Sequence, residues 1–147
     1  MKIQVCNREE IEHGIVVESA YVVISICDPG RKRPMVKRQS GLRDVLFLTF
    51  HDAEPSGGFE LPPEIKPMTS GQADEIRDFI RKHEPGVGTV VVHCEQGMSR
   101  SPAVAAAISD ALHLDGRRFW QLHSPNAYVY HMVADAFERG TDARKPG

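Results

Sequence analysis

The chain has 147 residues, of which 41% are apolar, 26% are charged and only 7% are aromatic. This size and composition fit one globular domain and exclude a disordered or fibrous protein. The net charge of -2 gives no overall attraction to nucleic acid or to an anionic membrane, so any anion-binding site must be local.

Three cysteines, Cys6, Cys27 and Cys94, form an odd set without the spacing of a disulfide framework. We therefore expect free thiols and a reducing, cytoplasmic location. The N-terminus is charged, and no apolar run approaches the ~20 residues that cross a bilayer, so we expect no membrane association. The prediction is a single domain over residues 1–140, followed by a flexible C-terminal tail over residues 141–147.

The first half of the chain alternates apolar runs with polar segments. Residues 3–6 predict a strand, and Asn7 with Glu10 has the spacing of a capping box that opens a short helix. Residues 21–27 and 45–50 are apolar and rich in β-branched residues, which predicts two central parallel strands buried on both faces. The long segment between them contains Pro, Gly and many charges and is typical of a loop.

Residues 51–71 carry too many prolines and glycines for a regular element. A second capping box, Thr69 with Gln72, then predicts a helix that ends near Glu84. Residues 89–92 predict another buried strand, and an alanine-rich helix follows from Ser101 to about Leu114.

Two more helices complete the predicted order. Asp115 can cap a short helix that ends at Leu122. Ser124 and Pro125 suit the cap and the first residue of the last helix, which we expect to end near Gly140. The sequence thus predicts an α/β fold with a mainly parallel central sheet of about four to five strands flanked by helices.

The segment "VVHCEQGMSRSPAVAAAI" over residues 91–108 concentrates the chemistry. A parallel strand delivers Cys94 to the carboxyl edge of the sheet, where ligands of such folds bind. The short turn that follows contains Gly97 and runs into a helix, so its backbone amides can converge on an anion. Arg100 adds a charged fork for two phosphate oxygens, and this positive field favours a thiolate nucleophile at Cys94.

The run "HCEQGMSRS" resembles the His-Cys-x5-Arg-Ser signature of the cysteine-based protein tyrosine phosphatases. The chain length and the alanine-rich helix are similar to the compact dual-specificity, bacterial-type branch of this superfamily. The resemblance covers residues 20–138 and implies a phosphatase-like fold with an anion-binding loop between the last strand and a helix.

The resemblance also implies a role for each residue of the run. Cys94 would attack phosphorus and form a phosphocysteine, Ser101 would help the sulfur leave in the second step, and His93 would orient the loop. The transferring oxygens would be held by Arg100 and by the backbone amides of the loop: Glu95, Gln96, Gly97, Met98, Ser99 and Arg100.

A leaving alkoxide or phenoxide needs a proton, which a carboxylic acid above the loop can supply. Asp52 follows the predicted strand 45–50, and the resemblance implies an aspartate on a mobile loop at a comparable place. Phe50 and His51 stand where larger relatives have Trp-Pro, so Asp28, at the end of the strand 21–27, remains the alternative acid. We expect His51 to be a local hydrogen-bond partner.

Two further features allow more than one interpretation. The basic run "RKRPMVKR" over residues 31–38 either steers a polyanionic substrate or is solvated surface. Cys27 is either a buried thiol or a reversible disulfide partner of Cys94. The histidines lack paired metal-ligand spacing, so we predict no metal and no cofactor.

The predicted function is a phosphomonoester hydrolase that acts on a phosphorylated protein or a small phosphomonoester, most simply a protein tyrosine or dual-specificity phosphatase. Nucleic acid is not expected as a partner, and the sequence leaves the oligomeric state open. The alternatives are a phosphoinositide or RNA 5′ phosphatase, a non-catalytic phosphate-binding protein, and a rhodanese-like sulfur transferase.

Overall fold

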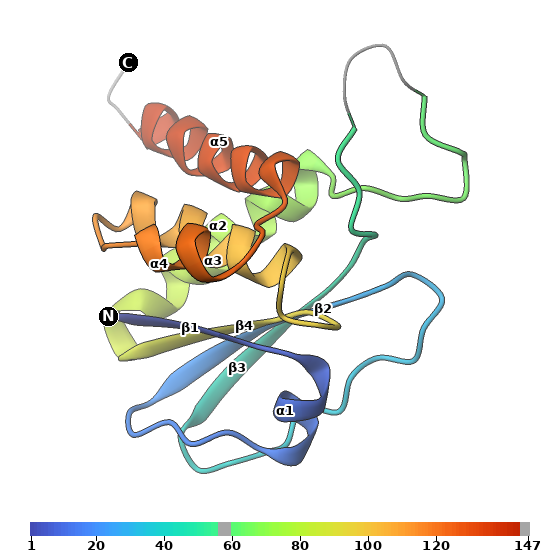
Figure 1. Cartoon of the computed structure of the whole chain (residues 1–147). Coiled ribbons are helices and arrows are strands. Elements are labelled where there is room, and N and C mark those ends of the chain that lie inside the picture. Colours follow the sequence, from blue (N-terminus) through green and yellow to red (C-terminus); the bar gives the residue numbers. More distant parts are fainter. Residues whose placement is uncertain (56–59, 145–147) are drawn as a thin grey trace.

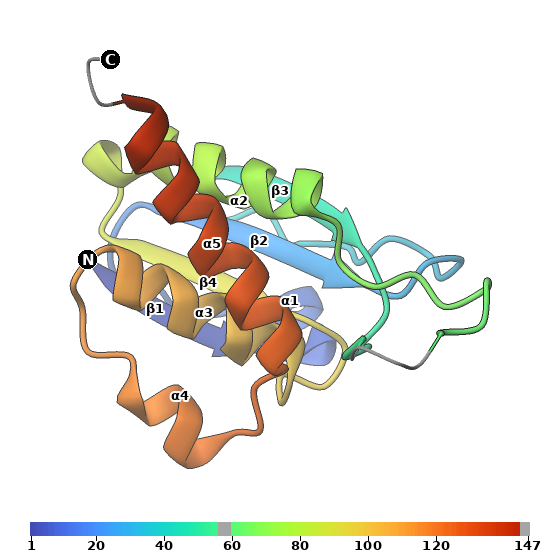
Figure 2. The same cartoon turned by 90° about the horizontal axis from the view of Figure 1, so that it is seen from above.

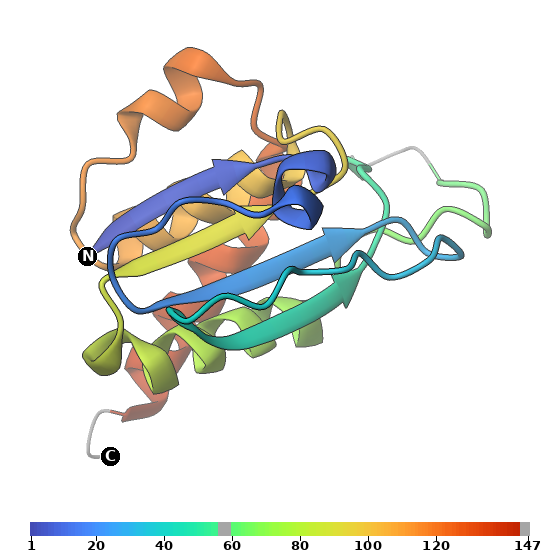
Figure 3. The same ribbon diagram turned by 90° about the horizontal axis from the view of Figure 1, so that it is seen from below.

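The computed structural model describes residues 1–55 and 60–144, with side chains as far as Gly140. Four strands form one parallel sheet in the order β1–β4–β2–β3. The strands are β1 (Lys2–Cys6), β2 (Tyr21–Cys27), β3 (Leu42–Thr49) and β4 (Thr89–His93). Their carboxyl ends meet at one edge of the sheet (Figure 3). The α/β fold and the parallel sheet predicted from the sequence are confirmed.

Most of the helices lie on one face of the sheet, and α1 lies on the other (Figures 1 and 2). The helices are α1 (Arg8–His13), α2 (Ser70–His83), α3 (Arg100–Ala111), α4 (Arg117–Leu122) and α5 (Ala127–Arg144), with a short 3₁₀ turn at Glu84–Gly86. None of the helices in the described part of the chain is long and apolar enough to cross a membrane.

Burial of β2 and β4 on both faces explains why their sequences are continuously apolar. Alternate residues such as Ile24 and Val92 face the main core under the helices. Ala103 and Ala106 of α3 belong to the same core and are fully buried. Small side chains let this helix approach the sheet closely, so its first turn is held firmly against the end of β4.

The opposite face carries a smaller core formed by Tyr21, Val23 and Val91 together with Ile11 of α1. The connection between β2 and β3 returns beneath this face (Figure 3). Its end is tied to the chain after α1, because the side-chain amide of Gln39 bonds both backbone groups of Ile15. The length of this loop therefore has a structural cause, which is that it covers apolar surface that no long helix covers.

Both predicted capping boxes are present. The side chain of Asn7 accepts from the Glu10 amide, and Thr69 accepts from the Gln72 amide. In each box the third helical side chain returns a bond to the cap backbone, so two free amides are satisfied at each helix start.

The prediction that β3 is a central strand is wrong. It spans Leu42–Thr49 and lies at the edge of the sheet, paired only with β2 among the described strands. Most of its residues are only half-buried. An apolar run predicts burial but not the position of a strand within its sheet, which depends on the pairing partners.

Three helix ends also differ from the predictions. α3 ends at Ala111, because His113 adopts a left-handed backbone with φ 59°. The last helix begins at Ala127, and its cap is Asn126, whose side-chain oxygen accepts from the Val129 amide, in place of Ser124. It continues to Arg144, past the predicted end near Gly140.

The short helix α4 has Gly116 at its cap position, one residue after the predicted cap, Asp115. The Asp115 carboxylate nevertheless accepts from the Arg117 amide and the Arg117 guanidinium. The predicted residue therefore satisfies an amide at the start of α4, from one position before the observed cap.

Candidate active site

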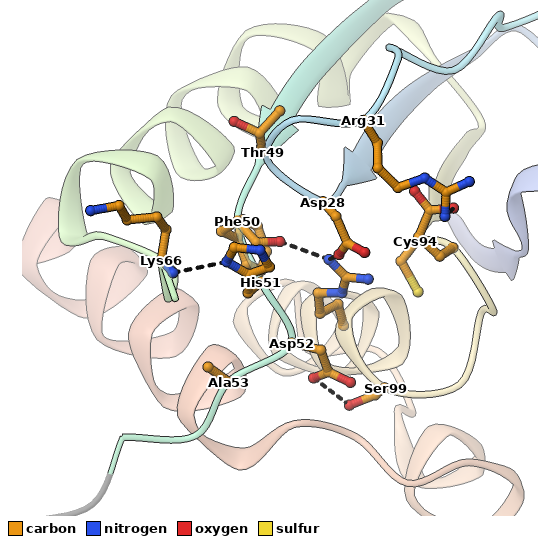
Figure 4. Close-up of polar contacts among 12 residues, drawn as sticks. Asp28, Arg31, Thr49, Phe50, His51, Asp52, Ala53, Lys66, Cys94 and Ser99 are labelled. Carbon is orange, nitrogen blue, oxygen red and sulfur yellow. Dashed lines mark hydrogen bonds and ion pairs between the residues drawn. The ribbon is translucent and has the colours of Figure 1, made fainter. Parts of the chain in front are cut away.

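The carboxyl ends of three neighbouring strands bring together side chains that are far apart in the sequence (Figure 4). β4 leads directly to Cys94, β2 leads to Asp28, and β3 leads through Phe50 to Asp52. This is the edge at which ligands of open parallel sheets bind.

Cys94 is 3% exposed, and it lines a cavity. The Gly97 amide donates to the Cys94 Sγ at 3.2 Å, and the Ser101 Oγ is also 3.2 Å from it. A thiolate at Cys94 would accept from both the amide and the hydroxyl, and these two bonds would stabilise its negative charge. The predicted curl of the loop around Cys94 is therefore present.

Gly97 is required by the shape of this curl. Its φ is 72°, in the left-handed region that other residues adopt at a cost. A Cβ at this position would lie 3.0 Å from both the carbonyl carbon and the carbonyl oxygen of Cys6. The loop thus packs its backbone against the end of β1, with no space for a side chain.

His93 is fully buried beneath the loop. Burial lowers the pKa of His93 to about 4, so the imidazole is neutral near pH 7. Its Nδ1 lies 3.4 Å from the Cys94 carbonyl and its Nε2 lies 2.6 Å from the Ser25 Oγ. Because a carbonyl only accepts, the proton belongs on Nδ1, and the Ser25 hydroxyl donates to Nε2. His93 therefore ties the loop to the neighbouring strand β2.

Arg100 is 5% exposed and is anchored by one nitrogen. Its Nη1 donates to the Asp28 Oδ1 and to the Phe50 carbonyl, both at 2.7 Å. Its Nε and Nη2 make no hydrogen bond to any residue that the structure describes. That edge of the guanidinium has the fork geometry that holds two oxygens of a phosphate.

Asp52 is held beside the loop by two donors. Its Oδ1 accepts from the Ser99 hydroxyl at 2.9 Å and from the Asn126 side-chain amide at 2.8 Å. Asn126 is buried, and it also donates to the Ala53 carbonyl and, through its backbone amide, to the Ser99 carbonyl. Asn126 thus joins the segment after β3, through its side chain, to the loop after β4, through its backbone amide.

A cavity of about 420 Å³ opens at this edge. Its described lining includes both candidate acids and most of the predicted loop. The lining residues are Asp28, Arg31, His51, Asp52, Ile65, Cys94, Glu95, Gln96, Met98, Ser99 and Arg100. The other predicted site residues, His93, Gly97 and Ser101, lie behind this surface and support it.

His51 closes the base of the long segment after β3. Its backbone amide donates to the Lys66 carbonyl at 2.6 Å, and its Nδ1 accepts from the Lys66 amide at 2.8 Å (Figure 4). The prediction that His51 is a local hydrogen-bond partner is confirmed. It also lines the cavity, which the sequence did not indicate.

The sequence did not reveal several residues that support the site. Ser25 lies within an apolar run that predicts a buried strand, and Arg8 lies in the short first helix, so neither was identified as part of the site. Asn126 was considered only as a helix start. The signal that could have indicated its role was its position directly before the last helix. When the side-chain oxygen of an asparagine caps a helix, its NH₂ group remains free to donate to another residue.

The two other cysteines are buried free thiols. Burial raises the pKa of the Cys6 thiol to about 12 and also raises the pKa of Cys27. Neither thiol is in a position that activates it as a nucleophile. Among the described residues, no group of three or more His, Cys, Asp or Glu side chains could hold a metal ion.

No protein-family model matches the sequence, and neither does any curated protein. Several solved structures share the fold, among them the following two. A human tyrosine phosphatase-like serine/threonine/tyrosine-interacting protein aligns with a TM-score of 0.51 and 21% identity over 82% of this chain and 78% of its own. A structure of PTPMT1 in complex with PI(5)P aligns with a TM-score of 0.52 and 16% identity over 86% of this chain and 81% of its own. The chain therefore has a phosphatase-like fold.

Proposed function

We propose that the protein hydrolyses phosphomonoesters through a phosphocysteine intermediate. The observation that supports this most directly is the arrangement around Cys94. Two hydrogen-bond donors point at its sulfur, and the cavity that it lines also contains the Arg100 guanidinium. Thiolate and guanidinium at the end of a parallel strand can bind and attack a tetrahedral dianion.

In the first step the Cys94 sulfur attacks phosphorus, an S–P bond forms, and the bond from phosphorus to the leaving oxygen breaks. Arg100 and the loop amides hold the three transferring oxygens. Asp52 gives its proton to the leaving oxygen. In the second step water attacks phosphorus, Asp52 takes a proton from that water, and the departing sulfur is stabilised by the Ser101 hydroxyl. The products are the alcohol and inorganic phosphate.

Asp52 is the better candidate for the acid, and Asp28 is assigned a positioning role. Asp28 pairs with Arg100 at 2.7 Å, so it would have to take up a proton, and lose this ion pair, before it could act as an acid. The partners of Asp52 are a neutral hydroxyl and a neutral amide, and both bond its Oδ1, so its Oδ2 can carry the proton while these bonds remain.

The first substrate class that we propose is phosphotyrosine, or phosphoserine and phosphothreonine, in proteins. The neighbour solved with PI(5)P makes a phosphoinositide the second candidate. An RNA 5′ phosphate is a third candidate without a specific observation in its favour. We further propose that residues 1–140 form a single catalytic domain. We also propose that the protein is cytoplasmic.

The experiment that tests the proposal measures hydrolysis of p-nitrophenyl phosphate. We expect activity that survives a chelator and is abolished in Cys94→Ser. The matched control is Cys27→Ser, which makes the same atomic change at another buried thiol and should retain activity. Rapid quenching followed by mass spectrometry should find phosphate on Cys94.

Two outcomes would contradict the proposal. Tight phosphate or phosphopeptide binding without turnover by the wild type would indicate a non-catalytic phosphate-binding protein. Persulfide formation on Cys94 with thiosulfate, without phosphatase activity, would indicate sulfur transfer.

A further inference from the structure

Glu95, the residue after Cys94, forms ion pairs with two arginines that differ in their exposure to solvent. Arg8, from α1, contacts the Glu95 Oε1 at 3.2 Å, and its side chain is 15% exposed. Arg31, from the loop after β2, contacts the Glu95 Oε2 at 3.3 Å, and its side chain is 57% exposed. The two contacts use different oxygens, so either can be broken without disturbing the other.

Arg8 is an integral part of the loop structure. Its backbone amide donates to the Glu95 carbonyl at 3.2 Å, and its Nη2 donates to the Lys32 carbonyl at 2.7 Å. It thereby joins α1, the loop after Cys94 and the loop after β2. If Arg31 moved away, Glu95 would still be paired with Arg8, and no unpaired carboxylate would remain in the wall of the cavity.

Arg31 itself is held weakly and lies where a substrate would pass. Its own side chain is 57% exposed, and an ion pair with so exposed a partner contributes little to stability. It lines the same cavity as Cys94, and in Figure 4 its side chain extends from the loop after β2 toward the nucleophile. Its guanidinium can therefore exchange Glu95 for an anion on a bound ligand.

The charges around the cavity are arranged asymmetrically. Arg31 lines the cavity on one side, and Lys32 and Arg33, which follow it in the sequence, are exposed. On the other side Asp52 is exposed at the cavity, and Glu54 bonds the first amide of α5. A flat anionic bilayer laid across the opening would meet this second, acidic rim, whereas a peptide can place an acidic group on one side only.

We propose that Arg31 forms a second anion subsite, and that the preferred substrate is a phosphopeptide with a carboxylate or a second phosphate next to the scissile phosphate. Arg31 leaves Glu95 and binds this second anion while Arg8 keeps the loop in place. This inference rests on the proposed phosphatase function and adds the substrate class to it. It gives a role to part of the basic run over residues 31–38.

The test compares two phosphotyrosine peptides that differ only in a Glu or a Gln beside the phosphorylated residue. For the wild type we expect kcat/KM to be about three- to tenfold higher for the Glu peptide at low salt, as one charge pair can provide. In Arg31→Gln this ratio should fall toward one. The matched control is Arg38→Gln, which removes the same charge from the same loop outside the cavity lining and should keep the wild-type ratio.

The binding arm separates this inference from the proposed function. Fluorescence anisotropy with Cys94→Ser, with and without Arg31→Gln, measures the same Glu-to-Gln ratio without turnover. Loss of the ratio in the Arg31→Gln background supports the subsite even if the wild type proves inactive. Equal binding of the two peptides by Cys94→Ser overturns the subsite even if the wild type is an active phosphatase.

Two other results would also overturn it. One is an equal loss of the ratio in Arg31→Gln and Arg38→Gln, which would indicate long-range attraction by the whole loop. The other is a wild type that does not prefer either peptide but hydrolyses phosphoinositide vesicles in a manner that depends on Arg31. This result would indicate that Arg31 binds a membrane surface.

Discussion

The two walls of the cavity are built in different ways. The segment from Cys94 to Ser101 is short, and its own Gly97 amide and Ser101 hydroxyl lie against the sulfur. The opposite wall comes from the segment after β3, where Asp52 is placed by Ser99, 47 residues away, and by Asn126, 74 residues away. A nucleophile site can thus be encoded locally, while the acid that serves it depends on the assembly of the whole domain.

The largest expected effect distinguishes the roles of the two acidic residues that line the cavity. Asp52→Asn should lower kcat for an alkyl phosphate about 10²- to 10⁴-fold, because an alkoxide leaves poorly without a proton. It should lower kcat much less for p-nitrophenyl phosphate, whose phenolate leaves readily. Asp28→Asn should lower the rates for both substrates by a similar factor, because it disturbs Arg100, which every substrate uses.

Steady-state kinetics with the two substrates checks this assignment. If Asp28→Asn shows the leaving-group dependence and Asp52→Asn does not, the two roles are reversed. A pH profile adds a second test, since only the residue that acts as the acid should remove the basic limb of kcat when it is replaced by asparagine.

A smaller effect is expected at Asn126, which tests whether the acid is positioned by distant contacts. Asn126→Ala should lower kcat for an alkyl phosphate about tenfold, because Asp52 loses one of its two donors. In the double variant with Asp52→Asn the second change should have almost no further effect. Additive losses would show that Asn126 acts independently of Asp52.

Asn126 also caps α5, so its substitution should lower the free energy of unfolding by about 1 kcal/mol. Thermal unfolding measures this contribution separately from kinetics. Ser124→Ala is a matched control on the same turn, since the Ser124 side chain makes no bond to any described residue. It should leave both the leaving-group dependence and the stability close to those of the wild type.

A separate effect, on stability rather than on rate, concerns the loop after Cys94 and its support by His93. The folded pKa of His93 is about 4, below the ordinary value of 6.5, so the unfolded chain binds the proton first as the pH falls. The stability present above pH 6.5 should therefore be lost as the pH falls toward 4, by an amount of order 3 kcal/mol.

Urea unfolding at a series of pH values checks this expectation. His93→Gln should reduce the loss between pH 6.5 and 4, because glutamine does not titrate. His131→Gln, at an exposed histidine of α5, should leave the loss unchanged. An equal loss in wild type and His93→Gln would mean that other groups cause the acid sensitivity.

The sequence alone determined the elements that have a local signal. Both capping boxes and the turn through Gly97 depend on residues only a few positions apart, so their spacing predicts them. The strands β2 and β4 are predicted by their continuous apolar runs. The position of Cys94 at the carboxyl edge follows from the strand before it.

Only the tertiary structure decided how these elements meet. It placed β3 at the edge of the sheet, paired Asp28 with Arg100, and turned Ser25 toward His93. Each of these contacts joins residues more than 60 positions apart or depends on strand order, and packing of the two cores selects them. Local spacing contains no information about such partners, because the chain between them can close in many ways.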